Sequence, residues 1–355
     1  MLPIIHELPA PDGFERLIYA EHKSSGLKSY IAIHSTVCGP AAGGCRMWNY
    51  DSDEAAKEDV LRLAKGMTSK NAIAGLGLGG GKSVIIGDAK TDKSADLLRA
   101  FGKVVDYLKG SYFTAEDVGI SPQDMAIVAQ ETPYAAGLNG GNFASGDPSP
   151  FTAEGVFQCL KVGADKVFKT KGLARKRVLV QGLGHVGMSL AEKLHESGAE
   201  LIVSDINTSL IDQAISKFDA KVCSTEHVFD TDMDIFAPCA LGGILSHDTV
   251  ANLSAKLICG AANNQLASPL IADEIQKRGI TYLPDYVVNA GGIINAAGEI
   301  LKQGHQYRDE RIKQITERIH DIIILSEKTG KTTIQIADEM VNEILMHAVQ
   351  NEGAA

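Results

Sequence analysis

The sequence VLVQGLGHVG at residues 178–187 decides the fold of this 355-residue chain. An apolar strand over 178–181 runs into Gly-x-Gly-x-x-Gly, a helix is predicted over 188–197, and a second apolar strand over 201–205 ends in Asp205. Strand, glycine turn, helix, strand and acid, in this order, form the context that a dinucleotide-binding fingerprint requires. We therefore predict a Rossmann-type parallel α/β sheet in this part of the chain.

The fingerprint also indicates which dinucleotide is bound. Its glycines let a pyrophosphate meet the helix N-terminus, whose free N–H groups favour an anion. Asp205 would accept hydrogen bonds from the adenosine ribose hydroxyls and repel a 2′-phosphate, and no arginine follows in residues 206–208. NAD is therefore favoured over NADP, and His185 is expected to face solvent rather than act in catalysis. The cofactor-binding residues predicted here are Gly182, Gly184, His185, Val186, Gly187 and Asp205.

A second glycine-rich stretch, GLGLGGGKS at residues 75–83, carries two incomplete nucleotide motifs. A P-loop would need a glycine where Leu76 stands. A Gly-x-Gly-x-x-Gly pattern is present, but an apolar strand at 84–86 follows it where the motif needs a helix. We interpret the stretch as a glycine turn. Lys82 at its end could hold a phosphate, hold a carboxylate, act as a base, or lie on the surface of a purely structural turn.

The composition disfavours several classes of function. A formal charge of -10 argues against nucleic-acid and anionic-membrane partners, which would need a basic surface. No apolar run approaches the roughly 20 residues that span a bilayer, and the N-terminus lacks the basic start and apolar core of a signal peptide. None of the six cysteines has C-x-x-C or zinc-site spacing. We expect a cytoplasmic protein with free thiols and no metal.

The residues before the fingerprint predict a separate α/β region. Apolar residues recur at helical spacing over 53–68, and Lys70 lies near the end of that helix, where a lysine most often stabilises the helix dipole. Glu116 and Asp117 stand where a short strand runs into a loop, a place that favours function. The other predicted elements are strands at 14–22, 28–34 and 84–86, a small-residue loop at 39–46, and a helix at 94–109.

A turn-rich segment at 139–150 is predicted to be a linker between two domains. We expect residues 1–140 to form a substrate-binding and oligomerisation domain and 141–330 an NAD-binding Rossmann domain. A C-terminal helix over about 331–355 could pack back on the first domain. The other predicted elements are strands at 234–237 and 256–259, a strand-to-glycine transition at 285–295, and helices at 308–328 and 334–350.

Together these segments resemble the Glu/Leu/Phe/Val dehydrogenase family, most closely its leucine dehydrogenase branch. The resemblance covers nearly the whole chain. It implies an α/β protein of two domains separated by a cleft, with an N-terminal substrate domain and a Rossmann-type NAD-binding domain. It also implies a homo-oligomer, either a dimer or an octamer. The segments that carry the resemblance are residues 39–41, 67–70, 79–85, 114–118, 182–187, 237–242, 260–264 and 289–292.

The resemblance implies roles for single residues. Lys82 would be the catalytic base, Asp117 would assist proton transfer, and Lys70 would bind the substrate α-carboxylate. Two lysines in one buried site disfavour each other's charge, so one of them can act as a base near neutral pH. The remaining residues expected are Asn263, Gly43 and Ala115 at the substrate, and Asn263, Arg46, Thr152, Cys239 and Ala240 at the cofactor.

The reaction implied is the NAD-dependent, reversible oxidative deamination of a branched-chain L-amino acid to the 2-oxo acid and ammonia. Leucine is the expected substrate, with valine and isoleucine. Ala115 favours this choice, because phenylalanine-preferring relatives tend to carry glycine there, although one methyl discriminates only roughly ten- to a few hundred-fold. Two alternatives stay open: a phenylalanine or tryptophan dehydrogenase of the same family, and a non-catalytic NAD-binding regulatory protein. The latter would be expected to lose Lys82 or Asp117.

Overall fold

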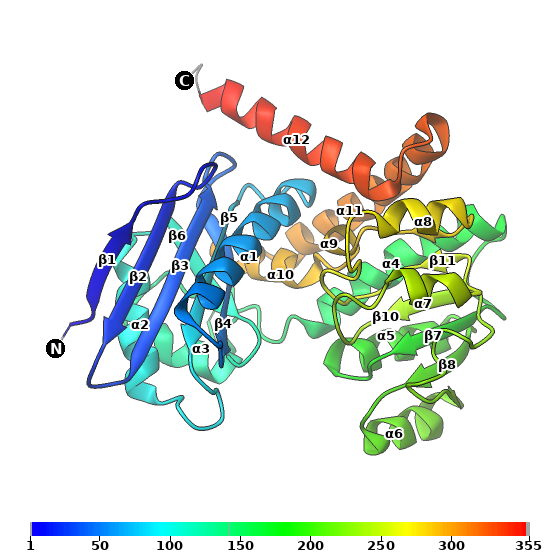
Figure 1. Cartoon of the computed structure of the whole chain (residues 1–355), viewed down its shortest axis with the longest axis horizontal. Coiled ribbons are helices and arrows are strands. Elements are labelled where there is room, and N and C mark those ends of the chain that lie inside the picture. Colours follow the sequence, from blue (N-terminus) through cyan, green and yellow to red (C-terminus); the bar gives the residue numbers. More distant parts are fainter. Residues whose placement is uncertain (1, 142, 353–355) are drawn as a thin grey trace. The chain divides into compact units, whose positions relative to one another are not determined.

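A computed structural model describes residues 2–141 and 143–352 and divides the chain into two compact units. Each unit contains one six-stranded sheet with helices around it (Figure 1). The predicted α/β class with a Rossmann-type sheet is confirmed. The first unit comprises Met1–Pro148, Ile293–Asp309 and Val341–Ala355, and the second comprises Ser149–Gly292 and Glu310–Met340.

The first unit is built on a mixed sheet with the strand order β1-β2-β3-β5-β4-β6. Strands β1, β2, β3 and β5 pair antiparallel in that order, whereas β4 lies between β5 and β6 and pairs parallel with both. The carboxyl ends of these three parallel strands therefore lie at one edge. The strands are β1 Ile4–Leu8, β2 Arg16–His22, β3 Leu27–Ser35, β4 Ala41–Trp48, β5 Gly79–Ile86 and β6 Tyr112–Glu116.

Apolar side chains alternate along these strands and give the sheet two buried faces. On one face Leu17 and Val84 pack with Val60 of helix α1. On the other face Ile18 packs with Phe101 of helix α2. Figure 1 shows α1 and α2 on opposite sides of this sheet. The helices that begin in this unit are α1 Asp53–Ile73, α2 Ala95–Tyr107, α3 Pro122–Val128 and α11 His305–Thr329.

Glycines in β5 let α1 and an aromatic ring pack directly on the strand backbone. A Cβ on Gly80 would overlap the backbone and hydroxyl of Thr68 in α1. A Cβ on Gly81 would lie 2.8 Å from the ring of Tyr112 on the other face. These glycines therefore serve close packing between layers of the fold, and no ligand is needed to explain them.

Two elements of this unit differ from those predicted. Most of the loop predicted at 39–46 is strand β4, which begins at Ala41. The glycine turn predicted over 75–83 is present at Gly75 and Gly77, which have positive φ, but strand β5 already begins at Gly79, so Lys82 lies within a strand. The prediction is wrong for 41–46 and for 79–83, because glycine normally weakens a strand and marks turns. In β4 and β5 the absence of side chains is what allows the neighbouring layers to approach.

The second unit is built on a fully parallel sheet with the strand order β12-β11-β10-β7-β8-β9. Counted from β7, this is the Rossmann order 3-2-1-4-5-6, and the order reverses between β7 and β10. Dinucleotides bind at the carboxyl ends of the strands beside this reversal. The strands are β7 Arg177–Gln181, β8 Glu200–Ser204, β9 Lys221–Val222, β10 Ile235–Pro238, β11 Leu257–Ile258 and β12 Thr281–Tyr282.

Helices cover both faces of the parallel sheet. Ile258 packs with Val250 of α7 and Ile275 of α8 on one face. On the other face α4 approaches β11 at Gly163, where a Cβ would lie 3.0 Å from a methyl group of Leu257. The helices are α4 Ser149–Phe168, α5 His185–Glu196, α6 Thr208–Phe218, α7 His247–Asn252, α8 Ile271–Lys277, α9 Asp285–Val288, α10 Gly291–Ile300 and α12 Thr333–Glu352, of which the last two begin in this unit.

The strand-to-glycine transition predicted at 285–295 is wrong, because this segment forms α9 and the start of α10. A short apolar run cannot be assigned to strand or helix by its periodicity alone. The terminal helices predicted at 308–328 and 334–350 are present as α11 and α12. Over the residues that the structure describes, no helix has the length and apolar character needed to cross a membrane.

Two glycine substitutions test the packing of α1 on the sheet. Gly80→Ala should lower the free energy of unfolding by about 1–3 kcal/mol, because its methyl group must displace α1. The matched control is Gly66→Ala in the exposed part of α1, where a Cβ meets nothing within 4 Å. It should raise the free energy by up to about 1 kcal/mol, because alanine favours a helix. Urea unfolding of both variants measures this, and equal effects would contradict the packing.

Candidate active site

An ion pair between a buried lysine and a partly exposed aspartate joins the parallel strands of the first unit. Lys82 on β5 is 6% exposed, and its Nζ lies 2.5 Å from Oδ2 of Asp117, which directly follows β6. Val84, two residues further along β5, packs toward α1, so Lys82 points to the same face of the sheet. The structure therefore brings together the two residues predicted to carry the chemistry.

Arg46 on β4 joins this pair instead of standing apart from it. Its Nε lies 3.6 Å from Asp117 Oδ2, and its Nη1 donates to Oδ2 of Asp59 on α1 at 3.0 Å. The hydroxyl of Tyr50 donates to the same oxygen at 2.7 Å, and Arg62 reaches Asp59 Oδ1 at 2.6 Å. Positive and negative groups therefore alternate from Lys82 through Asp117 and Arg46 to Asp59.

The charge of Asp117 is fixed by its surroundings. Burial opposes ionisation, but the nearby charges of Lys82 and then Arg46 outweigh it and lower the pKa of Asp117 to about 2. Asp117 is therefore a carboxylate at every pH at which an enzyme works. It can pair with a cation such as the ammonium group of Lys82.

Glu116, the residue before Asp117, behaves in the opposite way. Burial, then repulsion by Asp147 and by Asp117, raises its pKa to about 7. In this protein Glu116 therefore titrates near neutral pH, within a few ångströms of the Lys82–Asp117 pair along the chain. In the sequence Glu116 and Asp117 are two neighbouring strand-end acids, and nothing in the pattern distinguishes them.

Small apolar side chains gather beside β6. Ala115 forms a cluster with Ala136 and Ala296, against which Ile293 and Ile300 pack. The segment that carries Ala136 is tied to β6 by a hydrogen bond from Ala136 N to Thr114 O at 2.8 Å. We name this set the alanine cluster; its members carry no polar side chain.

The end of α1 places two further residues on this sheet. Lys70 lies in the last turn of α1, as predicted, and is half-buried. Asn71 is fully buried, and its side-chain amide donates to Gly79 O at 2.5 Å and to Ala42 O at 3.2 Å. Asn71 therefore ties α1 to both β4 and β5. Gly43 lies on β4, where its carbonyl accepts the Tyr112 hydroxyl at 2.8 Å.

The glycine turn of the second unit lies between β7 and α5. Gly182 has φ +93°, which a residue with a side chain adopts poorly, and a Cβ at Gly187 would overlap the carbonyl of Gly182. Helix α5 starts at His185 after Gly184, and no side chain caps it. Its first N–H groups are thus left for an anion.

Asp205 is held at this same turn. Its Oδ2 accepts a hydrogen bond from Leu183 N at 2.5 Å, and its Oδ1 accepts one from Asn207 N at 2.7 Å. The carboxylate therefore has a fixed position at the carboxyl end of β8, next to the glycines. An uncapped helix N-terminus beside a fixed acid fits a dinucleotide with free ribose hydroxyls.

The other predicted cofactor residues are distributed over the same unit. Cys239 and Ala240 follow β10, and Cys239 N donates to Gln181 O at 2.7 Å, which sets them beside the turn. Asn263 follows β11, and its Oδ1 accepts a hydrogen bond from Asn289 at 2.8 Å. Thr152 lies in the first turn of α4. Nothing in the sequence singles out Asn289, although it lies in the segment 289–292 that carries the family resemblance.

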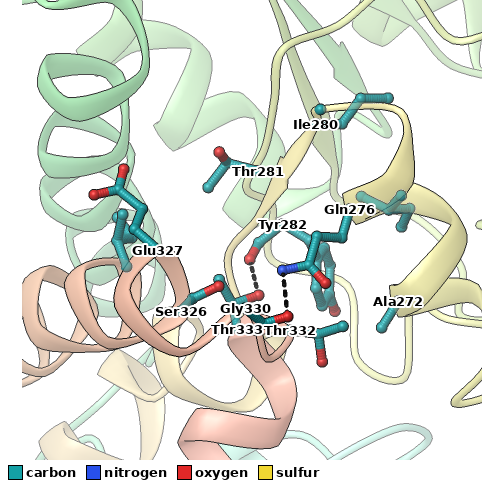
Figure 2. A pocket seen from close by; sticks show the side chains of 13 residues that line it. Ala272, Gln276, Ile280, Thr281, Tyr282, Ser326, Glu327, Gly330, Thr332 and Thr333 are labelled. Carbon is teal, nitrogen blue, oxygen red and sulfur yellow. Dashed lines mark hydrogen bonds between the residues drawn. The ribbon is translucent and has the colours of Figure 1, made fainter.

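A cavity of about 260 Å³ lies elsewhere in the second unit, between α8, β12 and the turn that joins α11 to α12 (Figure 2). Polar groups at its wall bond to one another. Gln276 donates to Lys331 O at 3.1 Å, and the Thr333 hydroxyl donates to Tyr282 O at 2.5 Å. None of the residues predicted for catalysis or cofactor binding lines this cavity. The cavity lies where these elements pack against one another.

The second unit has a Rossmann-ordered sheet with a glycine turn, and the first unit carries a lysine–aspartate pair. Together these features are typical of a dinucleotide-dependent oxidoreductase. Residues 16–134 match the family described as Glu/Leu/Phe/Val dehydrogenase, dimerisation domain. Residues 145–220 and 206–353 match Glutamate/Leucine/Phenylalanine/Valine dehydrogenase. The chain belongs to this family of NAD(P)-dependent amino-acid dehydrogenases.

Individual relatives agree with this assignment. The chain is 47% identical to leucine dehydrogenase of Geobacillus stearothermophilus, over 93% of this chain and 90% of that protein. It is 44% identical to valine dehydrogenase of Streptomyces virginiae, over 97% and 98% of the two chains. The crystal structure of L-tryptophan dehydrogenase from Nostoc punctiforme superimposes with a TM-score of 0.82 at 38% identity, over 95% and 97% of the chains. The family resemblance drawn from the sequence is confirmed.

Glu116 gives the first unit a measurable dependence on pH. Its pKa in the folded chain is about 7, above its ordinary 4.5, so its contribution to stability is full below about 4.5 and is lost as pH rises through 7. Glu116→Gln should therefore raise the melting temperature at pH 8 by about 2 °C or more, and the gain should vanish near pH 4.5. Thermal melts across this range measure it.

The matched control is Glu58→Gln, which removes an exposed acid from α1. It should change the melting temperature little, and by a similar amount at each pH. A Glu116→Gln gain that is independent of pH would show that Glu116 is ionised throughout and that its surroundings do not favour the proton.

Proposed function

We propose that the protein catalyses the NAD-dependent, reversible oxidative deamination of a branched-chain L-amino acid, with leucine preferred and valine and isoleucine accepted. The products are the 2-oxo acid and ammonia. The observation that carries this proposal is the buried Lys82–Asp117 pair on a sheet that also bears the alanine cluster. The leucine and valine dehydrogenases among its relatives support the substrate class.

Each residue of the pair has a chemical task in this proposal. Lys82 takes a proton from water, which then attacks the imine carbon of the oxidised substrate and leads to release of ammonia. Asp117 stays ionised and assists the proton transfer by holding the Lys82 amine in place. Lys70, at the end of α1, pairs with the substrate α-carboxylate.

The alanine cluster supports an aliphatic substrate side chain. Its side chains are those of Ala115, Ala136 and Ala296, with Ile293 and Ile300 packed on them. An aliphatic chain gains about 25 cal/mol for each Å² of apolar surface that such a wall takes from water. A glutamate carboxylate would find no side-chain partner in this cluster and would lose its hydration.

The fixed carboxylate of Asp205 supports NAD as the cofactor. Leu183 N and Asn207 N hold both of its oxygens, which leaves it ready to accept ribose hydroxyls and to repel a 2′-phosphate. Gly182, Gly184 and Gly187 would hold the pyrophosphate at α5. When bound, NAD accepts the hydride from the substrate Cα.

The proposal includes a homo-oligomer located in the cytoplasm. The description of residues 16–134 as a dimerisation domain supports an assembly of copies. All six cysteines are free thiols, which fits a reducing compartment.

The proposal is tested by absorbance at 340 nm with a panel of L-amino acids, each offered with NAD and with NADP. Leucine with NAD should give the highest kcat/KM, followed by valine and isoleucine. Phenylalanine and tryptophan should react at least about tenfold more slowly, because the Ala115 methyl would leave less room for an aromatic ring than the glycine expected in phenylalanine-preferring relatives. Faster turnover of an aromatic amino acid would overturn the substrate choice. Equal use of NADP would overturn the role of Asp205.

A further inference from the structure

Arg46 has a donor that it does not use. Its Nη1 is engaged by Asp59, but its Nε is buried and has no hydrogen-bond acceptor among the residues that the structure describes. The nearest carboxylate oxygen, Asp117 Oδ2, is 3.6 Å away, beyond the range of a hydrogen bond. Asp59 holds the guanidinium at this distance, and Tyr50 holds Asp59 in turn.

The Lys82–Asp117 pair beside Arg46 must lose its positive charge during catalysis. In the function proposed above, Lys82 works as a base and therefore passes through a neutral state. Asp117, which is partly buried, would then lose its nearest cation and keep the guanidinium of Arg46, 3.6 Å away. A carboxylate with too little positive charge nearby is unfavourable inside a protein. Arg46 cannot lose its own proton in a protein, so it stays positively charged beside Asp117 while Lys82 is neutral.

We propose that Arg46 is a positioning residue that keeps Asp117 a carboxylate while Lys82 is without its proton, and that Asp59 restrains Arg46 until then. The proposal rests on the function proposed for Lys82. A movement of a few tenths of an ångström brings the unused Nε into hydrogen-bond distance of Asp117. This role would replace the cofactor contact that family resemblance implies for Arg46.

The test must take account of the other charged and titratable groups around Asp117 and Arg46. Asp117 is approached by Lys82 from β5, by Arg46 from β4 and by Glu116 from β6, while Cys45 and Tyr112 feel its charge within the sheet. Burial raises the pKa of Cys45 to about 12 and that of Tyr112 still further, so both stay neutral. Asp59, Tyr50 and Arg62 surround the outer end of Arg46. Glu116 titrates near pH 7 and must be controlled.

Two substitutions should move the pH profile of oxidative deamination in opposite directions. In Asp59→Asn the released Arg46 turns onto Asp117 and competes with Lys82, so the Lys82 proton is held less tightly. The rising limb of kcat/KM should then move to lower pH. In Arg46→Gln, Asp117 depends on Lys82 alone, and the limb should move to higher pH. Each shift should be about one pH unit or more, as expected for charges within 4–6 Å.

Three further variants keep the comparison clean. Tyr50→Phe weakens the hold on Asp59 and should shift the limb in the same direction as Asp59→Asn, but less; it replaces that variant if Asp59→Asn does not fold. Arg99→Gln, which breaks an exposed Arg–Asp pair on α2, should leave the profile unchanged. Each profile is repeated in the Glu116→Gln background to remove the titration of Glu116.

A second readout separates this inference from the proposed function. Competitive acetylation with acetic anhydride, followed by mass spectrometry of the Lys82 peptide, reports the neutral amine without any turnover. The pH at which half of the Lys82 amine reacts should move to lower pH in Asp59→Asn and to higher pH in Arg46→Gln. If no amino acid is turned over but the acetylation midpoints of Lys82 shift as predicted, the proposed function is overturned and the role of Arg46 is supported. Folded Asp59→Asn and Arg46→Gln variants whose midpoints stay fixed, or move together, would overturn the role of Arg46.

Discussion

The ion pair between Lys82 and Asp117 is the interaction on which the rest of the first unit depends. A buried ion pair is poor evidence for stability, because desolvation of two charges can exceed their attraction. The fold nevertheless keeps this pair buried, with Arg46 and Asp59 behind it. Such an arrangement makes physical sense when the charges are needed for chemistry. It requires three parallel strands, because Arg46, Lys82 and Asp117 come from or directly follow β4, β5 and β6.

Helix α1 positions two of the candidate site residues relative to the sheet. Gly80 lets α1 lie directly on β5, and the amide of Asn71 fastens the end of α1 to β4 and β5. Asp59 and Lys70 are therefore carried to the sheet by one rigid helix. A larger residue at Gly80 would lift the helix and move both of them. The glycine-rich stretch thus affects the site indirectly, because it lets α1 pack closely on β5.

Sequence patterns predicted those parts of the fold whose residues are neighbours in the chain. The fingerprint at Gly182–Gly187, the acid at Asp205 and the order of strands around them follow from motifs of about 30 residues. Strand β4 was mistaken for a loop and the first half of β5 for a turn, because only the packed structure shows what occupies the space beside their glycines. Asp59 and Tyr50 gave no signal, since one lies in an ordinary amphipathic helix and the other in a short connection. Their importance comes from Arg46, which is distant in the sequence and adjacent in space.

The central claim is that Lys82 serves the chemistry of the amino group and the Gly182 turn serves the nucleotide. The most direct measurement compares the Lys82→Ala variant with the unchanged protein in two assays, leucine turnover at 340 nm and calorimetric binding of NAD. The account predicts that turnover falls by at least about a hundredfold while the NAD dissociation constant changes less than about threefold. Loss of NAD binding in this variant would make Lys82 a phosphate ligand and would contradict the account.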